Sequence, residues 1–329
     1  MNTKQDDSDG FPTAVTFTAG CALEADYIYV ASYLDAHDPL TTAFTRLFSY
    51  VSRFEDDQWF YHDADINAVA VCVKKATATM GRRVVTLSKE GEVEIYSNKD
   101  DTSIFEKIAE AGVRLGSRGY MTAIREIGNS LFACGANDQV YRRSEDGVWS
   151  LITSTPLEVL GPLETDISIL NSIDGTNEND VYTCGLDGGL FHYDGSRWSR
   201  IKLRTDEHLH CVRCVSTREV WVCGNNGTLL VGNALAGFRD VSSVDDNQQF
   251  WSLTKFRGSV FLATTSEGMF RYDGKEITPV DTGFGSGLWT YEVDSVENML
   301  WSFSPKEIAC FDGTRWARVN HPDNQLIVD

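Results

Sequence analysis

A repeated pair of short strands closed by Asp-Gly turns is the feature that most constrains this fold. Its clearest copy is NDVYTCGLDGGLFHYDGSRW, residues 179–198. Two runs of β-branched and aromatic residues, 181–185 and 189–193, flank a turn at 187–188, and a second turn follows at 194–195. Because Asp-Gly pairs between such runs are a strong hairpin signal, this copy predicts three short antiparallel strands.

The same unit returns along the whole chain. The aromatic residue that ends the second hairpin strand recurs, replaced once by glycine, at Tyr50, Tyr96, Tyr141, Tyr193, Gly232, Tyr272 and Phe311. These anchors are spaced by roughly 40 to 50 residues, with room for about four strands each, as a propeller blade requires. The sequence therefore predicts an all-β fold, a seven-bladed β-propeller of four-stranded antiparallel blades. Six or eight blades are the nearest alternatives.

We expect a single domain, because all-β domains of this length are common. The approximate blades are 11–62, 66–108, 120–152, 167–203, 208–241, 249–280 and 288–319, followed by a tail at 320–329. Most strands are apolar on both faces, as expected for sheets that pack between two neighbours. The tail could add an outer strand or pack against the first blade.

Three details of the early blades are less regular. The inner strand of the first blade is expected at 13–18, and the insertion at 35–45 is long enough for a loop or a helical turn. In the second blade, apolar residues from Ile104 to Leu115 have helix-like spacing, so its fourth strand could instead be a short helix.

Residues 181–198 resemble bacterial propeller repeats with the pattern G-x-x-G-x-L-x-x-Y-D-G-x-x-W. The matching residues are Gly185, Gly188, Leu190, Tyr193, Asp194, Gly195 and Trp198, and segments 220–231, 261–274 and 300–316 match more loosely. The last blade has Lys306 in place of a turn glycine, and the first two blades match poorly. The resemblance implies a propeller fold, and such repeats occur in proteins of many roles.

Charge limits the classes of partner. The formal net charge is −19, which argues against nucleic acid and anionic membranes because both attract basic surfaces. A basic protein partner is compatible with this charge. The N-terminus has no apolar signal segment, so we expect a cytoplasmic protein and, with no indication of self-association, a monomer.

Three cysteines have equivalent places in successive repeats. Cys134, Cys184 and Cys223 each precede a turn, and Gly follows each of them. In a chain without an export signal we expect reduced thiols that fill the core as small side chains.

The weak metal candidates are His208 and His210. Residues two apart on a strand share a face, so these imidazoles could converge on one ion. Cys211 and Cys214, three apart, would face opposite ways, so this segment does not supply a closed four-ligand site. Two histidines at a strand end without a metal is the alternative that we prefer, and we expect no cofactor.

No nucleophile elbow, phosphate-binding loop, zinc-protease or calcium-loop motif appears in the sequence. Acidic runs at 55–57, 100–101 and 245–246 could supply paired carboxylates for acid–base chemistry. Solvated loop charge is the interpretation that we prefer, and we assign no catalytic residue.

A binding surface follows from the blade geometry. Counting back from the anchors places His210, Trp251 and Trp289 at equivalent starts of inner strands, with Tyr120 or Met121 in the third blade. The preceding loops are acidic and contain Asp206, Glu207, Asp245 and Asp246. Trp and Tyr are prominent in protein-binding hot spots, so these residues predict a recognition surface at one end of the inner strands. The alternative is that the tryptophans pack in the channel or between blades.

We therefore predict a non-catalytic, protein-binding propeller with an acidic surface for a basic partner. One concrete form is an immunity protein that binds and neutralises a basic cognate bacterial toxin. The alternatives are a hydrolase or lyase with its active site at the channel mouth, and an assembly scaffold.

Overall fold

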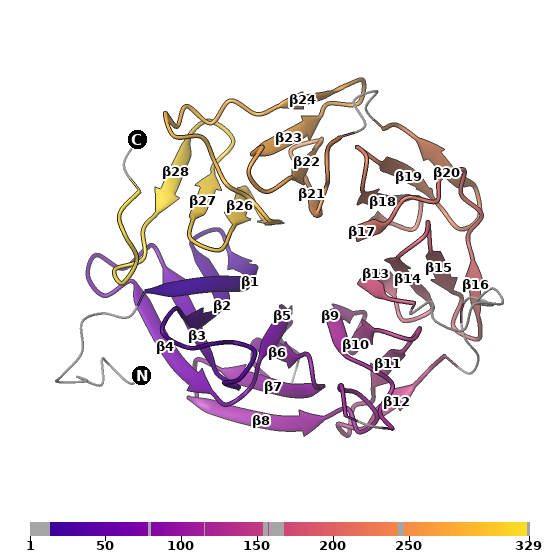
Figure 1. Ribbon diagram of the computed structural model, residues 1–329, viewed down its shortest axis with the longest axis horizontal. Coiled ribbons are helices and arrows are strands. Elements are labelled where there is room, and N and C mark those ends of the chain that lie inside the picture. Colours follow the sequence, from indigo (N-terminus) through magenta and orange to yellow (C-terminus); the bar gives the residue numbers. More distant parts are fainter. Residues whose placement is uncertain are drawn as a thin grey trace. The chain divides into compact units, whose positions relative to one another are not determined.

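The chain is all-β across the residues that the computed structural model describes, which are 14–77, 80–114, 116–153, 157, 168–242 and 247–327. Its strands form seven four-stranded sheets, and strands adjacent in the sequence are neighbours in each sheet (Figure 1). No helix occurs among these described residues. The fold is a seven-bladed β-propeller, and the prediction from the repeat spacing is confirmed.

The strands of the first three blades are β1 (Val15–Glu24), β2 (Tyr27–Leu34), β3 (Thr45–Val51), β4 (Trp59–Ala64), β5 (Ala68–Lys74), β6 (Arg83–Ser88), β7 (Glu92–Ser97), β8 (Thr102–Lys107), β9 (Met121–Ile127), β10 (Ser130–Gly135), β11 (Val140–Arg143) and β12 (Trp149–Leu151). The fourth and fifth blades have β13 (Leu170–Asn177), β14 (Asp180–Gly185), β15 (Leu190–Tyr193), β16 (Trp198–Arg200), β17 (Leu209–Ser216), β18 (Glu219–Gly224), β19 (Leu229–Asn233) and β20 (Gly237–Asp240). The last two have β21 (Ser252–Phe256), β22 (Ser259–Ala263), β23 (Met269–Tyr272), β24 (Ile277–Pro279), β25 (Glu292–Val296), β26 (Met299–Phe303), β27 (Ile308–Phe311) and β28 (Trp316–Val319). Every anchor residue lies on the third strand of its blade.

The structure has two compact units, which we describe separately. The first comprises the described residues up to Ser88, residues 94–104 and the residues from Thr254 onward. The second comprises residues 89–93 and 105–253.

In the first unit, carboxylates of one inner strand bind the backbone of the next. The backbone N–H of Gly20 donates to Glu292 Oε2 at 3.0 Å, and that of Ala22 donates to Asp294 Oδ2 at 3.0 Å. β1 and β25 therefore run side by side in the same direction. The backbone N–H of Val15 also donates to Asn324 Oδ1 at 2.8 Å. The start of the tail thus packs against the first blade, and its described residues add no strand.

In the second unit, side chains of one inner strand also bind the backbone of the next. Asp174 Oδ2 on β13 accepts from the backbone N–H of Cys214 at 2.8 Å, and Ser172 Oγ accepts from that of Val212 at 3.2 Å. Asp174 is buried, so some of the carboxylates that make the chain acidic stabilise the contact between blades.

The recurring Cys-Gly pair has a packing explanation. Cys134, Cys184 and Cys223 are free thiols and fully buried, as the sequence predicts for core residues. A Cβ added to Gly185 would lie 2.0 Å from the Ile169 carbonyl oxygen, and one added to Gly224 would lie 2.1 Å from that of His208. Glycine is therefore needed where the start of the inner strand crosses the end of the second strand.

The clearest repeat folds as its turn residues predict. Asp187 and Gly188 both have positive φ, 52° and 65°, which a tight hairpin turn requires. Asp194 Oδ1 accepts hydrogen bonds from Ser196 and Arg197, and these bonds lower the pKa of its carboxyl group, that from Ser196 Oγ most strongly. Tyr193 stacks on Trp198 with ring centroids 5.2 Å apart.

One expectation for the early blades needs correction, and one alternative is decided. β1 continues to Glu24, well beyond the expected end at residue 18, because small residues with little strand signal continue its pairing with β2 across two bulges. The fourth strand expected in the second blade is present as β8, and the helical alternative for this segment is wrong. The insertion after β2 forms turns, in which the backbone N–H of Thr42 donates to the Asp38 carbonyl at 2.9 Å.

Candidate functional site

His210 and Trp251 meet in the second unit. Each lies at the start of an inner strand, His210 on β17 and Trp251 directly before β21. Their rings stack with centroids 4.2 Å apart and an interplanar angle of 24°. The two residues have the equivalent strand-start positions that the sequence predicts, and in the structure their rings are in direct contact. Both side chains remain partly exposed.

The imidazole of His210 is held in one orientation. Its Nε2 lies 2.6 Å from Asn225 Oδ1, and because that oxygen only accepts, Nε2 carries the proton. Burial lowers the pKa of His210, since it disfavours the imidazolium form. His210 therefore presents a neutral, fixed ring beside Trp251.

The loop before β17 carries two of the predicted acidic residues. Asp206 is exposed, and Glu207 Oε1 accepts from Asn226 Nδ2 at 2.7 Å. Together with His210 and Trp251 these residues form what we call the His210 patch. Asp245 and Asp246 lie outside the described residues.

The two histidines that were weak metal candidates are directed at different partners. His208 Nδ1 accepts from the backbone N–H of Asp187 at 3.1 Å, whereas His210 Nε2 points at Asn225. Among the described residues, no group of three or more His, Cys, Asp or Glu side chains is placed to hold a metal ion.

Trp289 lies in the first unit, just before β25, and 57% of it is exposed. Tyr291 beside it is 44% exposed, and we call these two residues the Trp289 patch. The backbone N–H of Trp289 donates to Glu307 Oε2 at 3.1 Å. Glu307 in turn forms a buried ion pair with Arg318 at 2.6 Å, so a rigid base supports these exposed rings.

Tyr120, the remaining predicted surface residue, is partly buried directly before β9. Its carbonyl oxygen accepts from the backbone N–H of Ala136 at 2.9 Å. A Cβ on Gly135 would lie 2.2 Å from that oxygen, so the backbone of Tyr120 is part of the joint between β9 and β10.

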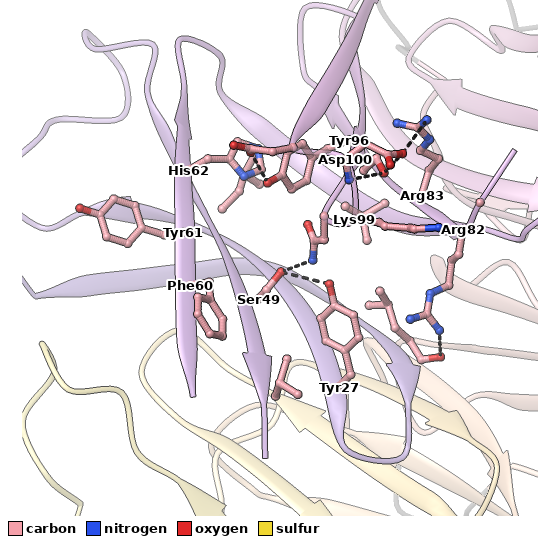
Figure 2. Close-up of a pocket in the computed structure, with 18 of the residues that line it drawn as sticks. Tyr27, Ser49, Phe60, Tyr61, His62, Arg82, Arg83, Tyr96, Lys99 and Asp100 are labelled. Carbon is pink, nitrogen blue, oxygen red and sulfur yellow. Dashed lines mark hydrogen bonds and ion pairs between the residues drawn. The ribbon is translucent and has the colours of Figure 1, made fainter. Parts of the chain in front are cut away.

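A pocket of about 650 Å³ in the first unit, between sheets β1–β4 and β5–β8, was not predicted from the sequence (Figure 2). Its wall residues come from β1, β2, β3, β4, β6 and β7 and from the segments before β6 and after β7. They include Tyr27, Ser49, Phe60, His62, Gly81, Arg82, Arg83, Tyr96, Asn98, Lys99 and Asp100. These residues are scattered over the first hundred positions and share no local motif. The only sequence signal is the poor match of the first two blades to the repeat.

The pocket has aromatic walls and hydrogen-bonded polar groups. Tyr96 packs on His62 with ring centroids 4.1 Å apart, and His62 Nε2 lies 3.2 Å from the buried carboxylate of Glu94. Tyr27 Oη lies 3.3 Å from Ser49 Oγ, which accepts from Asn98 Nδ2 at 2.8 Å. Burial raises the pKa of Tyr27, so its hydroxyl group stays protonated.

No helix that is long and apolar enough to cross a membrane is found in the described part of the chain.

Comparison with known proteins adds one relative of similar length. The chain is 26% identical over 297 residues to the Immune protein Tsi7 of Pseudomonas aeruginosa, covering 90% of this chain and 94% of the relative. No family model matches the chain. The sequence-based hypothesis of a protein-binding immunity function agrees with this relative.

Solved structures with similar folds are distant in sequence. YCF48 from Cyanidioschyzon merolae has a TM-score of 0.65 at 11% identity, covering 92% of this chain and 96% of that one. The WD40 propeller domain of Doa1 has a TM-score of 0.62 at 12% identity, with 90% and 92% covered. Virginiamycin B lyase from Staphylococcus aureus has a TM-score of 0.59 at 10% identity, with 76% and 83% covered. At these identities the likeness concerns the fold alone.

Proposed function

We propose that this chain is an immunity protein that binds and neutralises a cognate bacterial toxin. The observation that carries the proposal is the similarity to the Immune protein Tsi7, which extends over nearly the full length of both chains. A similarity confined to a few blades would reflect the repeat, whereas one of this extent includes the segments in which the blades differ.

The proposed mode of action is occlusion by binding. The Trp289 patch offers two exposed rings on a rigid base, and the His210 patch offers a fixed imidazole–indole stack. Preorganised aromatic side chains of this kind suit a protein interface because little conformational freedom is lost on binding.

The proposed partner is basic. The net charge of −19 and the exposed Asp206 near His210 favour a positively charged toxin surface. Such complementarity raises the association rate, which matters for a protein that must capture a toxin before it acts. We further propose that the chain acts as a monomer in the cytoplasm, with neither nucleic acid nor a membrane as its partner.

The test is co-expression with the genes adjacent to this one. Each neighbouring open reading frame is induced in a sensitive bacterial host, alone and together with this chain. We expect one neighbour to stop growth alone and to be harmless with the chain, and the two proteins to co-purify as a salt-sensitive complex. The proposal is wrong if no neighbour is toxic, or if every toxic neighbour remains toxic when the chain is present.

A further inference from the structure

The joint between sheets β1–β4 and β5–β8 lacks the tryptophan that other blades supply. The outer strands β4, β12, β16 and β28 begin with Trp59, Trp149, Trp198 and Trp316, whereas β8, β20 and β24 begin with Thr102, Gly237 and Ile277. In three of these blades the tryptophan pairs directly with the third-strand aromatic residue, with stacked or tilted rings: Trp59 with Tyr50, Trp198 with Tyr193 and Trp316 with Phe311. In the third blade Trp149 stands opposite Arg143 instead. The corresponding third-strand aromatic of the second blade is Tyr96.

Tyr96 finds its aromatic neighbour outside its own blade. The imidazole of His62, from the preceding blade, packs against it with ring centroids 4.1 Å apart. Figure 2 shows these two residues among those that line the pocket. The aromatic residue that β8 does carry, Phe105, is 71% exposed. The chain therefore leaves space between these two blades that its own side chains do not fill.

Two buried polar atoms in this pocket lack hydrogen-bond partners. Asn98 Oδ1 is an acceptor without a donor, and Arg83 Nε is a donor without an acceptor. The nearest carboxylate oxygen to the Arg83 guanidinium, on Asp100, is 3.7 Å away. Because buried polar groups are almost always paired, these atoms indicate a ligand that can donate and accept within a mainly aromatic space. Both atoms are closed off from solvent, so the Asn98 and Arg83 side chains must turn toward the ligand when it binds.

We propose that this pocket receives a tyrosine or tryptophan side chain of the bound toxin. The inference rests on the proposed immunity function and adds a specific contact to it. The incoming ring packs against Tyr27, Phe60 and Tyr96, and its O–H or N–H donates to Asn98 Oδ1. A tyrosine hydroxyl group, or a backbone carbonyl beside the tryptophan, accepts from Arg83 Nε.

The pocket's charges favour an aromatic occupant over a basic one. Arg82 pairs with Glu24 at 2.8 Å, and Lys99 extends the positive side of the pocket. Five cationic side chains line the pocket (Arg46, Arg53, Arg82, Arg83 and Lys99) against three carboxylates (Asp63, Asp100 and Asp101). A lysine or arginine from the toxin would therefore meet a net positive charge. A neutral aromatic ring with a polar tip avoids this repulsion and buries a large apolar area.

The pocket is separate from the Trp289 patch within the first unit. β1 and β25 run in the same direction, Trp289 precedes β25, and the pocket includes Leu23 near the end of β1. The two sites therefore lie at opposite ends of these inner strands. A loop or terminal segment of the toxin must reach the β1–β2 turn, and substitutions at one site leave the other intact.

The first experiment measures the pocket without the toxin. N-acetyl-tryptophanamide, N-acetyl-tyrosinamide, N-acetyl-leucinamide and N-acetyl-argininamide are titrated into the ¹⁵N-labelled full chain. We expect the two aromatic amides to shift the Asn98 side-chain and Gly81 backbone resonances at lower concentration than the other two. Equal or tighter binding of the leucine or arginine amide would overturn the inference.

The second experiment blocks the pocket. Gly81 lines it, an added Cβ there meets nothing within 4 Å, and its φ is not in the left-handed region, so Gly81→Trp can fill the space without backbone strain. Gly81→Ala is the matched control. Relative to that control, we expect Gly81→Trp to bind the toxin about thirtyfold or more weakly, as for loss of a hot-spot contact. Thermal melting of both variants verifies that they are folded.

Asn98→Leu tests the same contact without filling the space. It removes the acceptor at similar size, and we expect it to weaken tyrosinamide and toxin binding together. If both Gly81→Trp and Asn98→Leu bind the toxin as the wild type does, the pocket is not the docking point and the inference fails, while the immunity function stands. If no toxin is neutralised, the proposed function fails, and the amide titration still decides what the pocket accepts.

Discussion

Sheets β13–β16 and β5–β8 are two copies of one repeat with different outcomes. In β13–β16, Tyr193 stacks on Trp198 of the same sheet, and Asp194 closes the turn between them. In β5–β8, Tyr96 packs on the imidazole of His62 from the neighbouring blade, and a pocket of about 650 Å³ lies beside it. The regular copy uses its conspicuous residues for folding, whereas the irregular copy leaves polar and aromatic groups accessible to a ligand.

This difference shows how a repeat fold acquires a specific surface. Each blade needs an inner strand, two hairpins and a filled joint to its neighbour, and most copies meet these needs with their own residues. Where one copy loses its tryptophan, the joint is completed by another side chain or by a partner. Stability should therefore concentrate in the regular copies and recognition in the irregular ones.

The largest expected effect on stability comes from removing a tryptophan side chain that fills the space between two blades. Trp316 is 7% exposed and stacks on Phe311 at 4.9 Å, so Trp316→Ala should lower the free energy of unfolding by about 3 to 5 kcal/mol. Phe105→Ala, on the outer strand of the irregular copy, should change it by less than about 0.5 kcal/mol because that ring is exposed. Urea denaturation of both variants makes the comparison, and equal losses would refute it.

A second effect, on the pH dependence of stability, concerns a histidine buried among aromatic side chains. His321 packs against Phe48 and Trp59 at 4.4 and 4.6 Å, and burial lowers its pKa to about 4. The unfolded chain, with an ordinary pKa near 6.5, then binds the proton first, so acidification favours unfolding. This group alone should remove about 3 kcal/mol of stability between pH 7.5 and pH 4.

His321→Phe isolates that contribution, since the phenyl ring keeps the aromatic packing but does not titrate. The variant should lose less stability than the wild type over the same pH range in urea denaturation at stepped pH. Parallel pH profiles for the two proteins would show that His321 is not the responsible group.

A smaller effect compares two histidine–carboxylate pairs. His62 faces Glu94, whose side chain is 1% exposed, whereas His192 faces Asp180, which is 18% exposed. His62→Ala should cost about 2 kcal/mol because it leaves a buried carboxylate with one partner fewer. His192→Ala should cost about 1 kcal/mol, since water can reach Asp180. Thermal unfolding at pH 7 ranks the two variants, and the reverse order would contradict the account of the pocket.

The smallest expected effect concerns long-range charge. Asp206→Lys should slow association with a basic toxin a few-fold at low salt and much less at high salt, because exposed charges act mainly on the encounter rate. Glu145→Lys makes the same change of charge on the exposed β11–β12 turn. Association rates at two salt concentrations separate the variants, and identical salt dependence would place the toxin away from the His210 patch.

Much of the fold could be predicted because its signals are local. The third-strand anchors, the turns at Asp187-Gly188 and Asp194-Gly195, and the buried Cys184 are each fixed by residues close in the sequence. The full length of β1 was missed because its small residues carry no strand pattern.

The candidate sites were only partly predictable, because they depend on contacts between blades. Counting back from the third-strand anchors placed His210 and Trp251 at corresponding positions, but only the structure shows that their rings stack. The pocket joins Ser49, Gly81 and Asn98 from three separate segments, and no spacing in the sequence connects them.

The stoichiometry of neutralisation tests the central claim most directly. The purified chain is titrated into a fixed amount of the purified toxin from the neighbouring gene, and the remaining toxin activity is measured. An immunity protein that acts by binding should reduce this activity linearly, reaching zero at about one chain per toxin. Full activity at excess chain, or complete inactivation by a small fraction of an equivalent as an enzyme would achieve, would contradict the account.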